Sequence, residues 1–572
     1  MKHSRTTRRA RVAACTAIAL AAGALFAGPA AASGAADGPH GSVQRTAPKA
    51  DPRSDVDLPR QTARGTFRSA AAAAPLRFDA DRDGEADQLY LAIDGNYYVA
   101  PGAGGEDVEF SLGQNASLDY KDVIPVGKLD GDAYHDLLTL STDGKLSLFR
   151  GTDSFGTSTT AAWTGAGWNI YNKVFSPGDL TGDGRADVLA RDHGGVLWIY
   201  KNNGTVSRPF DSRVKVGAGW QYYDHLIGTN DVNGDGIADL AARDTTGNLY
   251  TYLGTGNTLA PFKAAVKVGT GWNIYNQVVG TDDLNGDGLG DLIGRTTAGQ
   301  LYVYYATGSG TWTARAAGAP DLSFVTQFAA QGGVPAFQRA DTIARDSAGT
   351  LWWYYSKNNG TLSKRQQISD PGGWKDAKIT LASALGRYNA SDLVEVAGTK
   401  LYVNGKPLTS GWDIYNHLVG AGDLSGDGKG DLLARDKSGV LWLHQGNGSA
   451  TGFSARVKIG AGWGAFTKLS GAGDLTGDGR GDLLARDGAG NLFVYPGTGQ
   501  AGAPFAKPIK TGTGFNIYKQ LLVAGDLTGD GRADLLATDA SGVLYRYDSY
   551  GNAKLTARAK IGTGYQIYPN MY

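Results

Sequence analysis

An aspartate that returns about every fifty residues is the feature that most constrains this chain. Each copy precedes a short, mostly apolar run such as DLLARD at residues 431–436, and successive copies stand 49 to 52 residues apart except for one interval of 39. The ten positions are Asp87, Asp136, Asp187, Asp239, Asp291, Asp341, Asp392, Asp431, Asp482 and Asp534. Repetition at this period is typical of arrays in which each unit buries its faces against its neighbours. The chain of 572 residues is therefore expected to form ten units rather than one ordinary core.

The residue pattern within a unit predicts four short strands. In one copy, residues 273–282 precede an acidic loop, residues 291–296 follow it, and residues 301–308 come after a glycine turn; residues 455–460 exemplify the last strand in another copy. Aromatic and β-branched residues are enriched in these segments, while Gly, Asn and Asp mark the turns between them. Four-stranded units at this period indicate an all-β fold of β-propeller architecture.

The number of rings is open at this stage. Propellers usually contain four to eight blades, and the units fall twice into two divergent copies followed by three regular ones. This order favours two five-bladed propellers, over residues 75–320 and 321–572. One larger ring is the alternative, because the first unit lacks its aromatic strand and residues 562–572 carry a spare one. The short interval between Asp392 and Asp431 predicts that one strand is lost there.

Seven units carry a nine-residue acidic loop with oxygen-bearing side chains at positions 1, 3, 5 and 9 and glycine at position 6, as in DLNGDGLGD from Asp283. A hard cation such as Ca²⁺ takes six to eight oxygen ligands, and glycine permits the sharp turn. Position 12 lacks the glutamate of an EF-hand, and the flanks are strands. The loops predict up to seven calcium ions. The alternative is a set of metal-free Asx-type turns.

The predicted calcium ligands are four residues from each loop. They are Asp79, Asp81, Asp83, Asp87, Asp179, Thr181, Asp183, Asp187, Asp231, Asn233, Asp235, Asp239, Asp283, Asn285, Asp287, Asp291, Asp423, Ser425, Asp427, Asp431, Asp474, Thr476, Asp478, Asp482, Asp526, Thr528, Asp530 and Asp534. Seven near-copies with the same neighbours cannot each be a specialised active site, so no catalytic residue is assigned here. The units at Lys128, Asp341 and Asp392 have lost ligands and are expected to pack without metal.

The N-terminus indicates export. Residues 1–33 hold a basic region, an apolar stretch near residues 12–27 and small residues around Ala30 to Ala32, which together predict a cleaved signal peptide and a secreted protein. Residues 34–74, rich in Ala, Arg, Pro and Ser, are expected to be a disordered linker. Cys15 is the only cysteine and lies within the predicted signal peptide. The mature protein is therefore expected to be stabilised by something other than disulfides.

Charge and hydropathy argue against nucleic-acid binding and against a membrane span. Residues 1–33 carry five of the 55 basic residues and no acidic one, so the mature chain holds 50 basic against 55 acidic residues, a balance of −5. Nucleic-acid binding needs a basic face and is not expected. Outside the signal, no run of about 18 apolar residues is present, and no membrane span is expected.

The repeat GDLTGDGRADLLARD resembles the FG-GAP/VCBS repeat family, whose propeller blades carry calcium in a strand-connecting loop, as in integrin α-subunit heads. The resemblance covers about residues 75–572. It implies a propeller fold and bound calcium, but it says little about activity. A shorter motif, GWNIYN, is similar to segments of tachylectin-like five-bladed propellers that bind amino sugars. The candidate ligand-binding residues in these motifs are Trp168, Tyr171, Trp220, Trp272, Tyr275, Trp412 and Tyr415. The alternative is that these rings wedge neighbouring blades together.

The preferred function is a non-catalytic, lectin-like recognition module for a glycan or cell-surface ligand, with multivalency raising avidity. A protein-binding adhesion or assembly subunit and an exported polysaccharide-active enzyme are the alternatives. The sequence holds neither a G-x-S-x-G nor an H-E-x-x-H motif. His225 and His417 share one repeat position and are expected to face solvent, and His135 stands alone beside a damaged loop.

Overall fold

The structure is a computed structural model that describes residues 39–41, 43–46, 55–56, 58, 74–112, 120–153, 155–330, 341–383, 385–386, 391–471 and 473–572. The predicted signal peptide, residues 1–33, lies outside these residues. Within them the regular elements are strands and six three-residue 3-10 turns, which confirms the all-β prediction. No helix in this part of the chain is long and apolar enough to cross a membrane.

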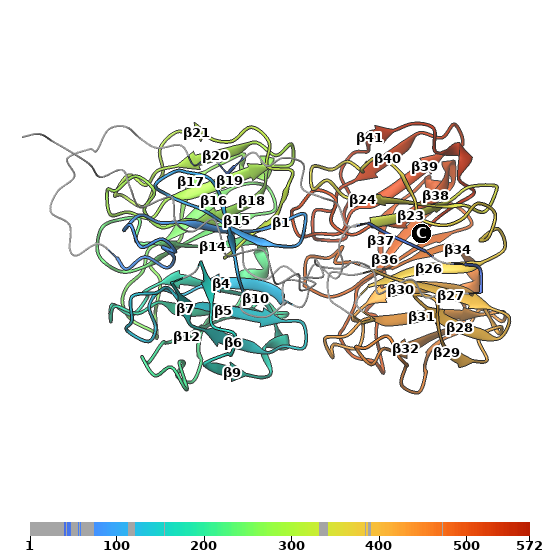
Figure 1. The fold of residues 1–572 in the computed structure, drawn as a ribbon, viewed down its shortest axis with the longest axis horizontal. Coiled ribbons are helices and arrows are strands. Elements are labelled where there is room, and N and C mark those ends of the chain that lie inside the picture. The colour runs from blue at the N-terminus through green and yellow to red at the C-terminus, as the bar shows by residue number, and fades with distance from the viewer. Residues whose placement is uncertain are drawn as a thin grey trace, which may run out of the picture.

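Ten four-stranded antiparallel sheets form two sets of five, called here the first and second ring; they lie next to each other along the long axis in Figure 1. The sheets of the first ring are β22-β1-β2-β3 (Val325–Phe328, Gln88–Ala92, Tyr97–Ala100, Val108–Phe110), β4-β5-β6-β9 (Tyr120–Pro125, Leu137–Ser141, Leu146–Phe149, Trp163–Gly165), β10 to β13 (Tyr171–Gly178, Asp187–Asp192, Leu197–Tyr200, Val214–Gly217), β14 to β17 (Tyr223–Asn230, Asp239–Asp244, Leu249–Tyr252, Val266–Gly269) and β18 to β21 (Tyr275–Gly280, Leu292–Thr296, Leu301–Tyr304, Ala316–Ala317). A two-stranded ribbon, β7 and β8 (Gly151–Thr152, Gly156–Thr157), extends one blade.

The second ring repeats this plan. Its sheets are β42-β23-β24-β25 (Asn570–Met571, Asp341–Arg345, Leu351–Tyr355, Gln366–Gln367), β26 to β29 (Lys378–Ser383, Ser391–Ala397, Lys400–Val403, Lys406–Ser410), β30 to β33 (Tyr415–Gly422, Asp431–Asp436, Leu441–Gln445, Val457–Gly460), β34 to β37 (Phe466–Ser470, Leu483–Asp487, Leu492–Tyr495, Ile509–Gly512) and β38 to β41 (Tyr518–Val523, Leu535–Asp539, Leu544–Tyr547, Ala559–Gly562).

Each ring is closed by a strand borrowed from its far end. β22 pairs with β1, with Phe328 opposite Tyr90, and β42 pairs with β23, with Met571 opposite Ala344. The spare C-terminal strand therefore completes the second ring and does not reach the first unit. The first ring extends through β22, beyond the boundary at residue 320 that the sequence suggested. Closure leaves no open edge between the first and last blade of a ring.

The blade with the short interval has not lost a strand, so that prediction is wrong. β28 and β29 are joined by a two-residue turn at Asn404 and Gly405, both with positive φ. In the blade that follows, β32 and β33 are separated by residues 446–456. The missing length is therefore loop, because a hairpin needs only two residues to reverse the chain.

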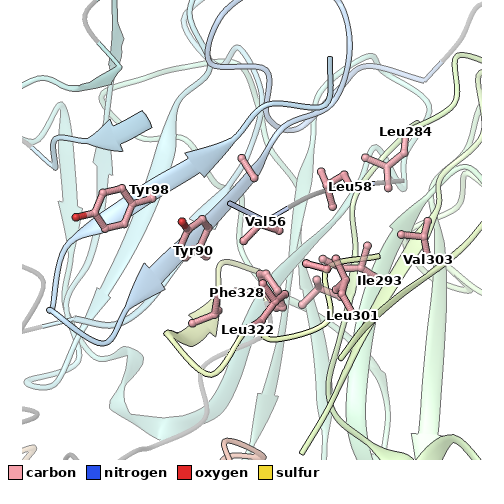
Figure 2. Packing of buried hydrophobic residues seen from close by; sticks show 14 of the residues in the cluster. Val56, Leu58, Tyr90, Tyr98, Leu284, Ile293, Leu301, Val303, Leu322 and Phe328 are labelled. Carbon is pink, nitrogen blue, oxygen red and sulfur yellow. The ribbon is translucent and has the colours of Figure 1, made fainter. Parts of the chain in front are cut away.

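Parts of the N-terminal segment are ordered, contrary to the prediction of a disordered linker over residues 34–74. Val56 and Leu58 are buried in a cluster with Tyr90, Phe328 and Leu322, shown in Figure 2. Nearer the N-terminus, Arg45 bonds to the second ring. Its guanidinium donates to Ser391 Oγ at 3.0 Å and lies 3.2 Å from Asp341 Oδ2. The segment thus contacts both rings, because apolar and charged side chains there find buried partners.

A 3-10 turn precedes the innermost strand of six blades. The turns are η1 (Trp168–Ile170), η2 (Trp220–Tyr222), η3 (Trp272–Ile274), η4 (Trp463–Ala465), η5 (Phe515–Ile517) and η6 (Tyr565–Ile567). Each follows a glycine in the left-handed region, such as Gly271 at φ 76°. The first aromatic ring of a turn packs against an aromatic on the third strand, as Trp272 does on Tyr304 at 4.4 Å between centroids.

An arginine on the second strand bonds each of six blades to the next one; it is buried in the first ring and half-buried in the second. Arg243 donates from one terminal nitrogen to the carbonyls of Trp272 at 3.0 Å and Tyr275 at 2.6 Å, and from the other to Asp224 at 2.8 Å. The arginines that bond in this way to the start of the next blade are Arg191, Arg243, Arg295, Arg345, Arg435 and Arg486. Sequence reasoning missed them, although the recurrent arginine of the DLLARD run was the available signal.

The rings stack in the same orientation. Acidic loops of the second ring contact the end of the first ring where its innermost strands begin. Gln277 Nε2 donates to the carbonyl of Gly529 at 2.9 Å, His193 Nδ1 lies 2.8 Å from the carbonyl of Asp478, and Arg532 pairs with Asp224 at 3.3 Å. One end of the first ring is therefore covered, while the corresponding end of the second ring is not covered by another ring.

Replacing the arginine fastener should destabilise the first ring. R243A removes two bonds to the next blade and leaves Asp224 without its 2.8 Å partner, and breaking a buried ion pair in this way costs about 3–5 kcal/mol of unfolding free energy. Urea denaturation of R243A and of the exposed-site control R208A measures the difference. A loss in R243A no greater than that of R208A would show that the fastener is not stabilising.

Candidate metal loops, the blade surface and the histidines

The first residue of each acidic loop organises the loop backbone. Asp231 Oδ1 accepts hydrogen bonds from Asn233 N at 3.0 Å and Gly234 N at 2.7 Å, and Oδ2 accepts one from Gly236 N at 2.7 Å. Gly234 and Gly236 have φ of 80° and 83°, where a side chain would be strained. The turn therefore holds its backbone donors around one carboxylate.

The ninth residue ties three segments of the blade together. Asp239 is fully buried; its Oδ2 accepts from Val232 N at 3.0 Å and its Oδ1 from Gly254 N at 2.7 Å. It thereby joins the start of the loop, the second strand and the end of the third strand. Each carboxylate oxygen can accept more than one hydrogen bond, so these contacts leave lone pairs for a cation.

The seven predicted loops lie in equivalent places, between the first and second strands of their blades. In the loop at Asp79, one carboxylate oxygen each from Asp79, Asp81 and Asp87 lie within 4.8 Å of one another. Where position 3 is Ser or Thr, its hydroxyl points at the first carboxylate, as Thr476 Oγ1 does towards Asp474 Oδ1 at 3.4 Å. The donor set is oxygen-rich and fits a hard cation.

The carboxylate at position 5 of the loop also interacts with the side chain at position 7. In three loops position 7 is arginine, and that arginine pairs with the fifth carboxylate. Arg185 lies 3.0 Å from Asp183, and Arg532 lies 2.8 Å from Asp530. Arg480 lies 3.7 Å from Asp478. These ion pairs neutralise part of the loop charge and compete with a cation for the same oxygens.

Burial makes the ninth carboxyls hard to ionise without a cation. It raises the pKa of Asp87, Asp187, Asp239 and Asp431 to about 7 in each case. The other carboxylates of the same loop add to the rise by repulsion, as Asp231 and Asp235 do at Asp239. A bound cation would remove this cost, which gives the loops an electrostatic reason to bind one.

The degenerate loop at Lys128 keeps its shape without the first carboxylate. Asp136 still accepts from Leu129 N at 2.8 Å and Gly151 N at 3.0 Å, while Lys128 is exposed and Arg150 pairs with Asp130 at 3.0 Å. The ninth aspartate thus makes the same backbone contacts in a loop that lacks the first metal ligand.

The aromatic residues singled out as ligand contacts are buried. Trp168, Trp220 and Trp272 are 7% to 8% exposed, and Trp412 is 4% exposed. Tyr171, Tyr275 and Tyr415 are 2% to 3% exposed. Their rings pack within and between blades, so they offer no free face to a sugar. This placement favours the alternative, in which these residues wedge neighbouring blades.

A different aromatic, on the third strand, is half-buried at the blade surface. Trp442 donates from Nε1 to Asp436 Oδ2 at 3.0 Å, and the Arg456 guanidinium lies 4.0 Å above its ring. The exposed Ile414 of the preceding turn bonds through its carbonyl to Lys437 N. We call this aromatic, its arginine and its aspartate the blade-surface cluster. Five blades carry the ring with its arginine: Trp198 with Arg213, Tyr302 with Arg315, Trp352 with Arg365, Trp442 with Arg456 and Tyr545 with Arg558.

The prediction that His225 and His417 face solvent is wrong for His225, whereas His417 is half-buried. His225 is buried in the first ring, where Nδ1 lies 2.8 Å from an Arg243 nitrogen, and burial lowers its pKa to about 4. His417 lines a cavity inside the second ring. Both lie on innermost strands, whose alternate side chains face the ring axis. His135 Nδ1 lies 2.8 Å from the carbonyl of Asp79 and joins two blades.

A model of the FG-GAP-like repeat matches residues 128–190, 179–241, 231–293, 423–485 and 474–537, each match running from one acidic loop to the next or its degenerate equivalent. The chain belongs to the FG-GAP repeat family, as the sequence predicted. No curated protein matches the chain.

Solved structures with similarity include three proteins from different organisms. An Agrocybe aegerita lectin, solved for its recognition of non-reducing terminal N-acetylglucosamine, is 17% identical over 87% of this chain and 96% of its own, with a TM-score of 0.22. The BP39L lectin of Burkholderia pseudomallei is 16% identical over 60% of this chain and 100% of its own, with a TM-score of 0.26. Saccharomyces cerevisiae Sqt1 is 11% identical over 78% and 86%, with a TM-score of 0.21. Similarity at these scores does not bear on what this chain binds.

The raised carboxyl pKa values predict how the chelator-treated protein responds to pH. The folded state holds protons near pH 6 that the unfolded state has released, since the unfolded pKa is 3.8 and the folded pKa about 7. Unfolding free energy should therefore fall as pH rises from about 4 to about 7. Thermal unfolding in EDTA at pH 5 and pH 8 should show the higher midpoint at pH 5. An unchanged or higher midpoint at pH 8 would contradict the assigned burial.

Proposed function

We propose that this FG-GAP repeat propeller is an exported, calcium-stabilised protein that recognises glycans at several equivalent sites. The observation that carries the proposal is the blade-surface cluster, because it repeats a half-buried aromatic ring beside fixed polar groups. Aromatic faces suit the apolar faces of sugar rings, and a nearby carboxylate and guanidinium suit their hydroxyls. Several weak copies on one rigid body can raise avidity by about 10² to 10⁴.

The geometry of the cluster supports a binding surface rather than a core. Trp352 repeats the arrangement of Trp442: Nε1 donates to Asp346 Oδ2 at 2.8 Å, and Arg365 lies 4.2 Å from the ring centroid. The turn before each such blade surface presents an exposed apolar residue, for example Ile414 at 41% and Ile170 at 45% exposure. An exposed apolar residue beside a half-buried ring supplies area that a ligand can cover.

Calcium is proposed for the seven complete loops, held by side chains of positions 1, 3, 5 and 9. Its role there is to neutralise the clustered carboxylates and fix the turn that leads into the second strand. Three of these loops, at Asp423, Asp474 and Asp526, belong to the second ring and lie towards the first, through Gly426, Asp478 and Thr528. A cation in them would also stiffen the contact between the rings.

The number of calcium ions bound per chain should fall when a single loop is altered. The mature protein, dialysed against calcium, should hold up to seven ions, and D235N should hold about one fewer because an exposed fifth-position ligand is weakened. D132N is the matched control, since it changes the same position in the loop that lacks the first carboxylate. Elemental analysis gives the stoichiometry. Absence of bound calcium in the wild-type protein, or equal loss in D132N, would refute the assignment.

Glycan recognition should depend on the blade surface. The full chain, tested on a glycan array and on cell-wall polysaccharide, should bind a defined set of glycans, and W442A should reduce retention because one ring of the array is lost. Y550A removes an aromatic that is 43% exposed outside the clusters and should leave retention unchanged. The proposal would fail in favour of a protein partner if the chain is retained on no glycan. The same follows if the chain still binds a cell-surface extract after that extract has been treated with glycosidase.

A further inference from the structure

The second ring contains a cavity of about 380 Å³ on its axis. Its wall is built from the innermost strands β26, β30, β34, β38 and β42, one from each blade of the ring. At the end away from the first ring, Lys378, Asn416 and Thr467 line it and are exposed to solvent. A cavity of this size lies within the range of small-molecule sites.

The charged groups that line this cavity are mainly cationic. Lys468 is half-buried, and its Nζ donates to Gln520 Oε1 at 3.4 Å. Burial lowers the pKa of Lys468, and Arg486 lowers it further by repulsion. His417 lies in the same wall, with Nε2 3.2 Å from the carbonyl of Leu469. Lys468 and Arg486 are therefore held close to each other, and no carboxylate is among the groups that shift the pKa of Lys468. Burial lowers the pKa of His417, and Arg435 and Lys468 lower it further, so His417 stands there as a polar imidazole.

The fastening arginines add to this charge at the mouth. Arg435 Nε donates to Asn416 at 3.1 Å, and Arg486 Nε donates to Thr467 at 3.2 Å. Arg345 lines the cavity and donates to Asn570 at 2.7 Å. Among the described lining residues the acid is Asp341, and it is already paired with Arg45.

The charged residues on the innermost strands differ between the two rings. Aligned along the innermost strands, Lys173 and His225 of the first ring correspond to His417 and Lys468 of the second. The first ring sets two acids beside its cations. Asp122 and Asp224 both raise the pKa of Lys173. In the second ring Lys378 and Thr467 stand at these two positions, because Lys378 pairs with Val396 where Asp122 pairs with Leu140. The second ring has kept the lysine and the histidine, in exchanged positions, and has replaced both acids.

Access differs between the two rings as well. The first ring is filled from one end by Arg77, whose guanidinium donates to the carbonyls of Ser176 at 2.8 Å and Gly280 at 2.9 Å. Its other end is covered by the second ring, where the carbonyl of Gly529 bonds to Gln277. The corresponding residue of the second ring, Gln520, lines the open cavity.

We infer that the axial cavity of the second ring, around Lys468 and His417, is a binding site for a compact organic anion that bears a carboxylate or a phosphate group. A carboxylate or phosphate would supply the charge that Asp122 and Asp224 supply in the first ring, and it would meet ammonium and guanidinium donors in a partly desolvated site. This site goes beyond the proposed blade-surface function, and neither rests on the other.

Calorimetric titration of the full chain with glucose 6-phosphate, glucuronate and glucose tests the site. At least one of the two anions should bind with one-site stoichiometry, and the neutral sugar should not bind there. K468Q should weaken anion binding at least about tenfold, which is about 1.4 kcal/mol. T467D restores the carboxylate of the first ring at an exposed position and should weaken binding by a similar factor. Binding of only one anion identifies the recognised group.

The matched control is K458Q, which removes one exposed lysine from the outer strand β33 of the second ring. Its anion affinity should stay within about twofold of wild type, and glycan retention should be unchanged in both K468Q and T467D. The inference is overturned if neither anion binds, if glucose binds as tightly, or if K458Q loses as much affinity as K468Q.

Discussion

The carboxylate of the ninth loop position is the interaction on which each blade depends. In the first ring Asp187 accepts from Leu180 N at 3.0 Å and from Asn202 N at 2.9 Å. In the second ring Asp431 accepts from Leu424 N at 3.0 Å and from Gly446 N at 3.1 Å. One buried side chain thereby fixes the loop, the second strand and the end of the third. Unpaired backbone donors would be costly at these sites, which explains why the aspartate persists where the other ligands are gone.

The same carboxylate links architecture to electrostatics. Its burial is required by the strands it joins, and that burial raises its pKa. The fold therefore places a group that resists ionisation beside two or three further oxygens. A divalent cation would resolve the conflict in the complete loops, whereas in the loop at Lys128 the absence of the first carboxylate reduces it. Structure and proposed metal binding are two consequences of one buried acid.

The two rings share one blade architecture but differ along their axes. In the first ring, Arg77 and the loops of the second ring fill the axis, and Asp122 and Asp224 balance the cations there. In the second ring the axis stays open, and Lys468 lacks the corresponding acids. The outward blade surfaces are more alike, with Trp198 and Trp442 each under an arginine. Stacking therefore separates a shared outer surface from an axial site that belongs to one ring.

The sequence by itself determined the repeat, the four-stranded blades and the position of every acidic loop, because these depend on local turn chemistry and strand periodicity. It also located the GWNIYN segments, but it could not determine that Trp272 is buried or that His417 faces an axis, since both follow from how blades close into a ring. Closure by β22 and β42, the order in Val56 and Arg45, and the open axial cavity were decided only by tertiary structure. Each of these depends on contacts between residues far apart in the chain, and such contacts leave no local pattern to read.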